Sequence, residues 1–410
     1  MAEPLTFCIV DDDPFAVRLH AGLLEGAGHA VISTTVSSQA MELILSRPVD
    51  CAILDITMPG IDGMALVQQL RADPRLRALK IVIVSGKPFE YDRERADACG
   101  VDGCLFKPVD PKSFVARLEA ILADRIEVRY WGVRGTLPVC GANALHYGGN
   151  TPCVTLEFAR GDLLIFDAGS GIKGLADHLV AQKRSRLEAR IFISHPHWDH
   201  INALPFFRPL YQQGNEFEIC GASHGDTDMR ELIFAQMDEV YCPVKVREFA
   251  ARVSFRNLGE ESFPLTGRIN MRTMLLNHPG NCLGYRVEYR GRSVCYITDN
   301  EIHPRESPYR NDHYVNKLAN FVAGTDLLII DAAYTDKEYP DRIHWGHSAI
   351  TPVVELASQA RVKALHLFHH DPDQNDAAIA AKEQTAVTLL QALQPDILCL
   401  APQEGQTFRI

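Results

Sequence analysis

The chain has 410 residues, which is too long for one ordinary domain, and an average of about 150 residues per domain predicts two or three. Its hydrophobic fraction of 46% and charged fraction of 23% are those of a globular protein, and its formal net charge of -11 argues against a surface that coats nucleic acid. Eleven scattered cysteines without a CxxC pair, with no signal segment and no apolar run of about 18 residues, indicate a cytoplasmic protein with reduced thiols and no membrane span.

The first third of the chain alternates short apolar runs with amphipathic stretches. This rhythm predicts an α/β domain with a doubly wound parallel sheet and helices on both faces. The predicted strands are FCIV (7–10), AVIST (30–34), CAILDI (51–56), KIVIVSG (80–86) and GCLF (103–106). Two of the predicted helices are FAVRLHAGLLEGAG (15–28) and GMALVQQLRAD (63–73), where apolar residues recur every three to four positions.

Polar residues stand where these strands end, which is where the crevice of such a sheet forms. They are Asp11, Asp12, Asp55, Ser85 and Lys107. Clustered carboxylates repel one another unless a hard cation neutralises them, so this pocket predicts bound Mg²⁺. An aspartate beside Mg²⁺, with an ammonium and a hydroxyl near it, is suited to accept a phosphoryl group.

The motifs VDDDP, LDITMPGIDG, VSG and FKP stand in the order and spacing of a known family. Residues about 5–124 closely resemble the receiver domain of two-component response regulators, a flavodoxin-like fold. The resemblance implies that Asp55 is the phosphoacceptor. It also implies that Mg²⁺ is bound by Asp11, Asp12, Asp55 and the carbonyl of Thr57.

The same resemblance implies how the phosphoryl group is detected and where it comes from. Ser85 and Lys107 would contact the phosphoryl group, and Phe106 would be the aromatic switch. The donor would be a cognate sensor histidine kinase. Ser85 stands where many members of the family carry threonine, a change that keeps the hydroxyl.

The junction PKSFVARLEAILADRIEVRYWGVRG (111–135) passes from an amphipathic helix into a strand without a Pro, Gly or Ser-rich spacer. We therefore expect two domains, 1–124 and 125–410, that pack together. Nothing after residue 125 resembles a helix-turn-helix, so we expect no DNA-binding domain.

The second domain mixes predicted strands with helices, which suggests an α/β sandwich. CVTLEFARGDLLIFDAGSGI (153–172) predicts a hairpin, GLADHLVAQ (174–182) a helix, and RIFIS (190–194) a strand. That strand leads into SHPHWDH (194–200), where His195 and His197 can face one point and suit a transition metal. Asp199 and His200 come at a predicted helix start and cannot easily reach the same ion, so two ions are expected.

A two-metal site needs further ligands, and three residues at predicted strand ends offer them. These are His278 after MRTMLLN, Asp299 after SVCYIT, and His369 after ALHLF. His370 competes with His369 for the last position, and His369 is favoured because it leaves the strand first.

HxHxDH followed by His, Asp and His closely resembles the metallo-β-lactamase fold superfamily, over residues about 127–410. The resemblance implies an αββα sandwich that binds two divalent transition metals, Zn, Mn or Fe, with Asp299 as the bridge. One ion would be held by His195, His197 and His278, and the other by Asp199, His200 and His369. Asp167 would orient one of the ligands, and His370 would lie next to the ligands without binding a metal. Asp199 would also handle the proton that is given to the leaving group.

Within that superfamily, DAAYTD (331–336), WGHSAI (345–350) and LHLFHHD (365–371) resemble the ribonuclease Z and cyclic-phosphate phosphodiesterase branch. By this resemblance His347 would contact the phosphate or protonate the leaving oxygen. The alternative is that His347 only caps the next helix, for which Ser348 or Thr351 is the expected N-cap. WGVRGTLP (131–138) resembles a Gly-rich strand-loop motif of the same branch. This resemblance implies that backbone N–H groups or Arg134 lie near the substrate.

The expected function is a dinuclear metal-dependent phosphodiesterase controlled by phosphorylation of Asp55. The substrate would be a small or cyclic phosphodiester or nucleotide, because no long basic excursion that could grip a tRNA is visible. Residues 205–265 form an apolar-aromatic insert that could be a lid, a homodimer surface or simple core packing. The alternatives are hydrolysis of a thioester, lactone or β-lactam, or a metal or redox sensor.

Overall fold

The computed structural model describes residues 4–76, 79–86, 99–158, 161–182, 186–240, 242–266 and 268–410. The chain divides into two compact units. The first is built mainly from residues up to Ile126, and the second comprises Glu127–Leu156, Leu163–Ala181 and Leu187–Ile410. Each unit is described below by itself.

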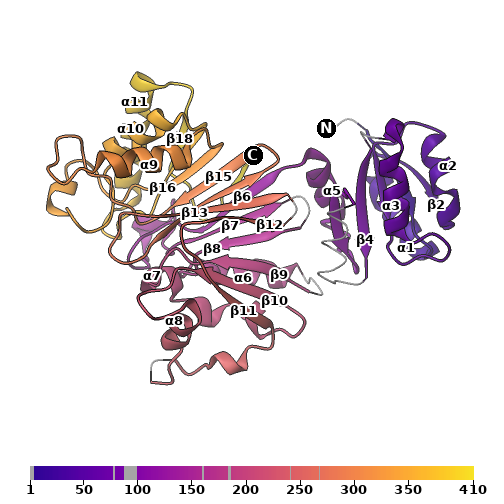
Figure 1. Ribbon diagram of the computed structural model, residues 1–410, viewed down its shortest axis with the longest axis horizontal. Coiled ribbons are helices and arrows are strands. Elements are labelled where there is room, and N and C mark those ends of the chain that lie inside the picture. The colour runs from indigo at the N-terminus through magenta and orange to yellow at the C-terminus, as the bar shows by residue number, and fades with distance from the viewer. Residues whose placement is uncertain are drawn as a thin grey trace. The chain divides into compact units, whose positions relative to one another are not determined.

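The first unit contains a five-stranded parallel sheet in the order β2-β1-β3-β4-β5 (Figure 1). Its strands are β1 (Thr6–Val10), β2 (Ala30–Thr34), β3 (Cys51–Leu54), β4 (Lys80–Ser85) and β5 (Gly103–Phe106). The predicted doubly wound sheet is confirmed, since this is the flavodoxin-like strand order. The third and fourth predicted strands are too long, because β3 ends at Leu54, which leaves Asp55 just beyond it, and β4 ends at Ser85.

Four described α-helices cover this sheet: α1 (Pro14–Gly26), α2 (Ala40–Leu45), α3 (Gly63–Ala72) and α5 (Phe114–Ala123). Alternate residues of each strand face opposite sides. Cys8 and Val10 of β1 therefore pack with α2 and α3, whereas Phe7 and Ile9 pack with α1 and α5. Asp13 caps α1 by accepting a hydrogen bond from the backbone N–H of Phe15, ahead of a proline at the first helical position.

The second unit contains two seven-stranded sheets. The first has the order β11-β10-β9-β8-β7-β6-β19 and consists of β6 (Ile126–Gly132), β7 (Cys153–Phe158), β8 (Leu163–Phe166), β9 (Glu188–Phe192), β10 (Glu216–Gly221), β11 (Arg252–Asn257) and β19 (Thr407–Arg409). The second has the order β12-β13-β14-β15-β16-β17-β18 and consists of β12 (Ser262–Thr266), β13 (Ile269–Leu275), β14 (Leu283–Tyr289), β15 (Arg292–Ile297), β16 (Leu327–Asp331), β17 (Ala364–Phe368) and β18 (Leu398–Leu400).

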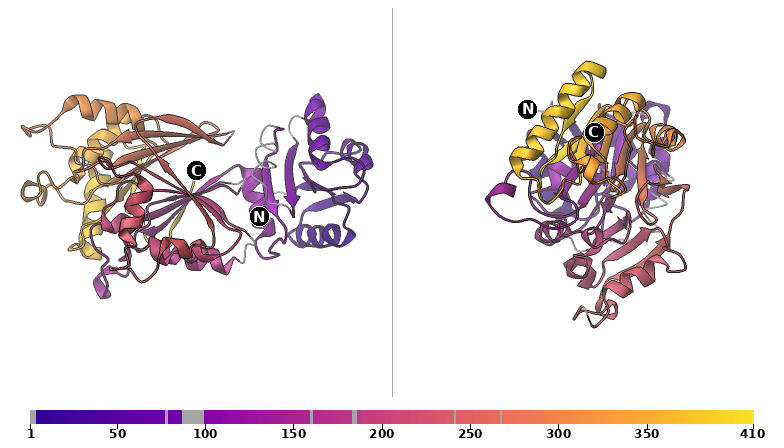
Figure 2. Two further views of the ribbon diagram at one scale, coloured as in Figure 1. Left: turned by 60° about the horizontal axis from the view of Figure 1, so that its bottom comes forward. Right: turned by 90° about the vertical axis from the view of Figure 1, so that its left-hand side faces the viewer.

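Helices cover the outer face of each of these sheets (Figure 2). On the first sheet they are α6 (Ile172–Ala181), α7 (Trp198–Ile201) and α8 (Met229–Gln236). On the second they are α9 (Asp312–Val322), α10 (Ile350–Ala360) and α11 (Asp376–Leu393). The expected αββα sandwich is confirmed, because each helical layer packs on one sheet and the sheets pack on each other.

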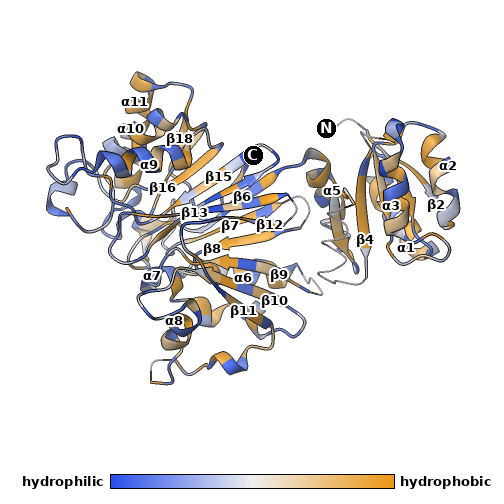
Figure 3. Ribbon diagram, viewed as in Figure 1, coloured by the Kyte–Doolittle hydropathy of each residue, from blue (hydrophilic) through white to orange (hydrophobic). Residues whose placement is uncertain are grey.

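Aromatic side chains fill the space between the two sheets. Phe166 and Phe192 come from β8 and β9, and Tyr285 and Tyr296 come from β14 and β15, with ring centroids 5.3–5.6 Å apart. All four rings are buried, and Figure 3 shows hydrophobic residues concentrated on central strands such as β8 and β16. This core holds the strand ends that carry the site in fixed positions.

The insert at residues 205–265 takes part in core packing. Phe207 and Leu210 are fully buried, in a stretch of short 3-10 turns at Leu204–Phe206 and Arg208–Tyr211. The insert then supplies β10, α8 and β11 of the first sheet and its helical layer. Among the described residues, no helix has the length and apolar character that crossing a membrane requires.

Candidate active site

The N-terminal pocket gathers two carboxylates around one ammonium group. Lys107 Nζ lies 2.7 Å from Asp11 Oδ2 and 2.7 Å from Asp55 Oδ1. Burial raises the pKa of Asp55, and the ion pair with Lys107 opposes this effect. The ends of β1, β3 and β5 thus bring these three residues together as the sequence predicts.

The other residues expected in this pocket lie at the same edge of the sheet. The backbone N–H of Thr57 donates to Asp55 Oδ2 at 2.7 Å. Ser85 is buried at the end of β4, Phe106 is half-buried at the end of β5, and Asp12 is exposed after β1. Solvent can therefore reach Asp12, whereas Asp11 and Asp55 are buried.

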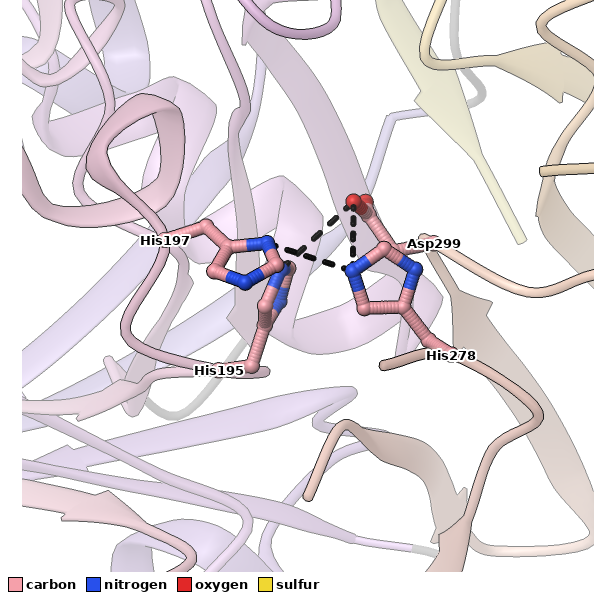
Figure 4. Close-up of side chains that lie close together, drawn as sticks. All are labelled: His195, His197, His278 and Asp299. Carbon is pink, nitrogen blue, oxygen red and sulfur yellow. Dashed lines mark hydrogen bonds and ion pairs between the residues drawn. The ribbon is translucent and has the colours of Figure 1, made fainter. Parts of the chain in front are cut away.

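The C-terminal unit contains a first group of possible metal ligands: His195, His197, His278 and Asp299. One ligand atom from each lies within 4.8 Å of the others. Figure 4 shows that the two histidines that follow β9 and the one that follows β13 converge on the carboxylate that follows β15. His197 Nδ1 lies 3.2 Å from His278 Nε2, and Asp299 Oδ2 lies 3.6 Å from His195 Nε2.

A second group consists of Asp199, His200, Asp299 and His369, again within 4.8 Å of one another. His200 Nε2 and His369 Nε2 each lie 3.1 Å from Asp299 Oδ1, and Asp199 Oδ2 is 3.2 Å from His369 Nε2. Asp299 therefore faces the first group with Oδ2 and the second group with Oδ1. Such a carboxylate has the arrangement needed to bridge two ions.

The protonation of His195 and Asp299 fits metal ligands. In His200, by contrast, burial is outweighed by the carboxylates of Asp199, Asp299 and Asp167, which raise the pKa of this residue well above its usual range. Burial lowers the pKa of His195 well below its usual range, which keeps the imidazole neutral. Burial opposes ionisation of Asp299, but the imidazoles of His200 and His369 hold its pKa well below the usual range. Within the described part of the chain, the buried Nε2 atoms of His195 and His200 make no hydrogen bond, although His200 Nε2 lies 3.1 Å from Asp299 Oδ1. Nitrogen and carboxylate donors of this kind suit divalent transition metals.

Asp167 supports the second group from behind. Its Oδ2 accepts hydrogen bonds from His200 Nδ1 at 2.8 Å and from the Tyr296 hydroxyl at 2.7 Å. Its Oδ1 accepts from the backbone N–H of Ser194 at 2.7 Å. These contacts fix the ring of His200 and leave its Nε2 directed at the group, as the sequence leads us to expect for Asp167.

Three of these residues have left-handed backbone conformations. Asp167, Asp299 and His369 have φ values of 58°, 42° and 59°. Each stands just past a strand, β8, β15 or β17, where the chain turns sharply. Non-glycine residues in this region are uncommon, and backbone strain of this kind concentrates at functional sites.

His347 adjoins the second group. Its Nδ1 lies 2.6 Å from Asp331 Oδ2, and its ring stacks on His369 with centroids 4.8 Å apart and planes 17° apart. Burial lowers the pKa of His347, but the Asp331 carboxylate outweighs this effect and raises it to about 9. Asp331 is the first residue of the motif DAAYTD, for which the sequence predicted no role of its own. Its position at the end of β16, beside strand ends that carry ligands, is the signal that would have found it.

Comparison with known proteins identifies both parts of the chain. The family model described as a beta-lactamase superfamily domain matches residues 163–370, half of the chain. The chain belongs to the beta-lactamase superfamily. A second family model, the response regulator receiver domain, matches residues 7–119, so this superfamily domain follows a receiver domain.

Individual relatives agree with this division. Protein PilH of Pseudomonas aeruginosa is 31% identical over 115 residues, which are 28% of this chain and 95% of PilH. Response regulator GtcR of Aneurinibacillus migulanus is 34% identical over 122 residues, 30% of this chain, and the match spans only about half (49%) of GtcR. The crystal structure of the metallo-beta-lactamase fold protein YhfI from Bacillus subtilis has a TM-score of 0.51 and 16% identity, covering 70% of this chain and 100% of YhfI. That last likeness shows a shared fold.

Two expectations for the helix after His347 are wrong. The N-cap of α10 is Ala349, which makes no side-chain cap, so neither Ser348 nor His347 caps this helix. The Ser348 hydroxyl donates to the carbonyl of Asn300 at 2.5 Å, and Thr351 lies inside the first turn. The free N–H of Thr351 in the first turn is satisfied by Asp336, which accepts hydrogen bonds from this N–H and from the Thr351 hydroxyl at 3.0 and 2.7 Å.

The expected role of Arg134 near the substrate is also wrong. Its side chain is fully buried in the superfamily domain and donates to the carbonyls of Gly148 and Gln374 at 2.9 and 2.5 Å. The loop reaches the site through its backbone, because the N–H of Thr136 donates to Asp199 Oδ2 at 2.8 Å.

His370 lies outside the ligand groups. Its ring is fully buried, 6.1 Å from the ring of Tyr147, and neither ring nitrogen has a hydrogen-bond partner among the described residues. Of these two histidines, His369 is the one that lies in a candidate ligand group.

A buried lysine also holds the segment that follows Asp331. Lys382 on α11 donates to the carbonyls of Ala332 and Ala333 at 2.6 and 2.9 Å and to Gln374 Oε1 at 2.8 Å. Burial lowers the pKa of Lys382 to about 7. No motif in the sequence marks this residue, since it lies on an ordinary helix.

We expect Lys382 to make stability depend on pH. Between pH about 7 and about 10.4 the unfolded chain binds a proton on this lysine that the folded protein does not, so the free energy of unfolding rises with pH there. In Lys382→Met this contribution, up to about 1.4 kcal/mol per pH unit, should vanish. Chemical unfolding of both proteins across this range measures the difference in slope. The exposed Lys363→Met is the control, and an unchanged slope in Lys382→Met would contradict the assignment.

Proposed function

We propose that the chain consists of a receiver domain, 1–124, that controls a dinuclear metal-dependent phosphodiesterase, 125–410. The substrate is a small or cyclic phosphodiester or nucleotide. The observation that carries the proposal is Asp299, whose two oxygens face two separate ligand groups beside an aspartate-paired His347.

Each ligand group would hold one divalent ion, Zn, Mn or Fe. The first would use His195, His197 and His278 and the second Asp199, His200 and His369, with Asp299 shared between them. Ions bound there would polarise a phosphoryl group and supply hydroxide at neutral pH. Asp167 and the Thr136 N–H keep the second set of side chains in place.

His347 would act as the general acid. Hydrolysis adds water across a P–O bond, so hydroxide joins the phosphorus and a proton joins the leaving oxygen. Asp331 holds His347 through Nδ1, which leaves the Nε2 proton for the leaving oxygen. The pKa of about 9 keeps that proton on the imidazole at neutral pH.

Turnover of bis(p-nitrophenyl) phosphate by the full-length protein loaded with Mn²⁺ or Zn²⁺ tests this function. We expect hydrolysis of this substrate and none of a β-lactam, a lactone or a thioester under the same conditions. Two bound metals without phosphodiester turnover, or turnover of the other substrates alone, would refute the proposal. Cyclic and linear nucleotides then define the natural substrate class.

Control by phosphorylation is a separate prediction. Asp55 would receive the phosphoryl group from a sensor histidine kinase, with Mg²⁺ bound by Asp11, Asp12, Asp55 and the Thr57 carbonyl. Ser85 and Lys107 would contact the group, and Phe106 would respond to it. A complete switch from mostly off to mostly on needs about 5.5 kcal/mol of differential stability, so even partial coupling changes the rate severalfold.

The test compares turnover by wild type and Asp55→Ala, each with and without beryllofluoride as the phosphoryl mimic. We expect the mimic to change the wild-type rate and to leave that of Asp55→Ala unaltered. Equal rates in all four samples would show that the receiver does not control the hydrolase.

A further inference from the structure

A buried carboxylate outside both ligand groups anchors the loop that carries His347. Glu301 is only 3% exposed and lies just past Asp299. Its Oε1 accepts hydrogen bonds from the Tyr339 hydroxyl at 2.7 Å and from the backbone N–H of His344 at 2.9 Å. Its Oε2 accepts from the backbone N–H of Gly346 at 3.1 Å. The Glu301 side chain thus accepts hydrogen bonds from three residues of the loop 339–347.

This loop has little regular structure of its own to hold it. Its one helical element is a 3-10 turn at Tyr339–Asp341. His344 and Gly346 have φ values of 68° and 84°, which places both in the left-handed region. The conformation therefore depends on contacts from outside the loop, and Glu301 makes three of them.

Gly346 connects Glu301 to a ligand of the first group. Its N–H donates to Glu301, and its carbonyl lies 3.0 Å from Nδ1 of His278. A Cβ at this position would lie 2.1 Å from that same Nδ1, so only glycine allows the approach. The next residue is His347. Displacement of Gly346 would therefore displace the proposed general acid.

Two further groups have ligand atoms within 4.8 Å of one another: Asp299, Asp331, His347 and His369, which overlaps the second ligand group, and Glu301, His303 and His344, which could be considered as a separate metal site. The Tyr339 hydroxyl occupies that space, 2.7 Å from both His303 Nδ1 and Glu301 Oε1. Both oxygens of Glu301 already accept hydrogen bonds. These contacts favour an anchor made of hydrogen bonds over a metal ligand.

We propose that Glu301 is a positioning residue for His347. It fixes the loop so that His347 is aligned to give its proton to the leaving oxygen. This inference rests on the proposed phosphodiesterase function. General acid catalysis contributes most when the leaving group is a poor one, because a good leaving group departs without a proton. Misalignment of the acid therefore affects the two kinds of substrate differently.

Glu301→Gln in the full-length, metal-loaded protein tests the proposal. Glutamine keeps the size of the side chain, but its NH₂ group cannot accept hydrogen bonds on both sides as the carboxylate does. We expect kcat/KM for methyl phenyl phosphate to fall by roughly tenfold to a hundredfold. We expect kcat/KM for methyl p-nitrophenyl phosphate to change by no more than about twofold, since p-nitrophenolate leaves readily.

Glu355→Gln is the matched control, because Glu355 pairs with Arg305 on the surface and should leave both rates unchanged. Tyr339→Phe removes one of the three donors to Glu301 and should give a smaller loss of the same selective kind. An equal fall on both substrates, or none on either, in a Glu301→Gln protein that retains two metals would overturn the proposal. If wild type hydrolyses neither substrate, the phosphodiesterase function itself fails.

Discussion

Asp299→Asn is expected to abolish nearly all phosphodiester turnover. The amide has one oxygen and carries no charge, so it cannot serve both ligand groups, whose facing atoms lie 3.1 to 3.8 Å from the two carboxylate oxygens. Loss of several kcal/mol of transition-state stabilisation from metal ions corresponds to about a thousandfold or more in rate.

The metal content of the variant shows whether turnover is lost because an ion is missing. Elemental analysis of dialysed protein should show two divalent ions per chain in wild type and fewer than two in Asp299→Asn. Asp312→Asn is the control, because Asp312 is exposed and pairs with Arg310 on the surface. Full metal content together with wild-type turnover in Asp299→Asn would exclude a bridging role.

His347→Gln is expected to keep both metals and lose the general acid. His347 pairs with Asp331 and belongs to neither of the two ligand groups described above, although its ring nitrogen also lies within 4.8 Å of Asp299, Asp331 and His369. Removal of a positioned general acid typically lowers rates about 10²-fold to 10⁴-fold. The fall should be large for methyl phenyl phosphate and small for methyl p-nitrophenyl phosphate.

Steady-state kinetics on the two substrates, with metal analysis of the same samples, measures this effect. His146→Gln is the control, because His146 is exposed and its ring contacts Gln403. If His347→Gln lost its metals, or if both substrates slowed equally, His347 would be a ligand or a structural residue and not the acid.

Much of the candidate site is predictable because ligands follow strands. Hydrophobic runs mark the strands, and the polar residue that ends each run must lie at the carboxyl edge of its sheet. Asp11, Asp55 and Lys107 are predictable neighbours for this reason, and Lys107 Nζ lies 2.7 Å from each of the two carboxylates. Asp299 and His369 are predictable in the same way, although they come from segments far apart in the chain.

The contacts that hold the site were not predictable in this way. Asp331 reaches His347 across 16 residues, and Glu301 reaches Gly346 across 45. Neither contact has a periodic or compositional signature, because each depends on where two loops lie after the sheets have packed.

The fold classes of both domains and the candidate metal-ligand motif are predictable from the sequence, because they depend on local apolar periodicity and on residue types at strand ends. Asp55 as the phosphoacceptor stays a prediction that the resemblance to receiver domains implies. Only the folded chain shows that His369 and not His370 lies in a candidate ligand group, and that Arg134 and Lys382 are buried. His369 and His370 are the same type of residue, and successive side chains at a strand end point in opposite directions. The packing of the backbone therefore determines which of the two faces the site.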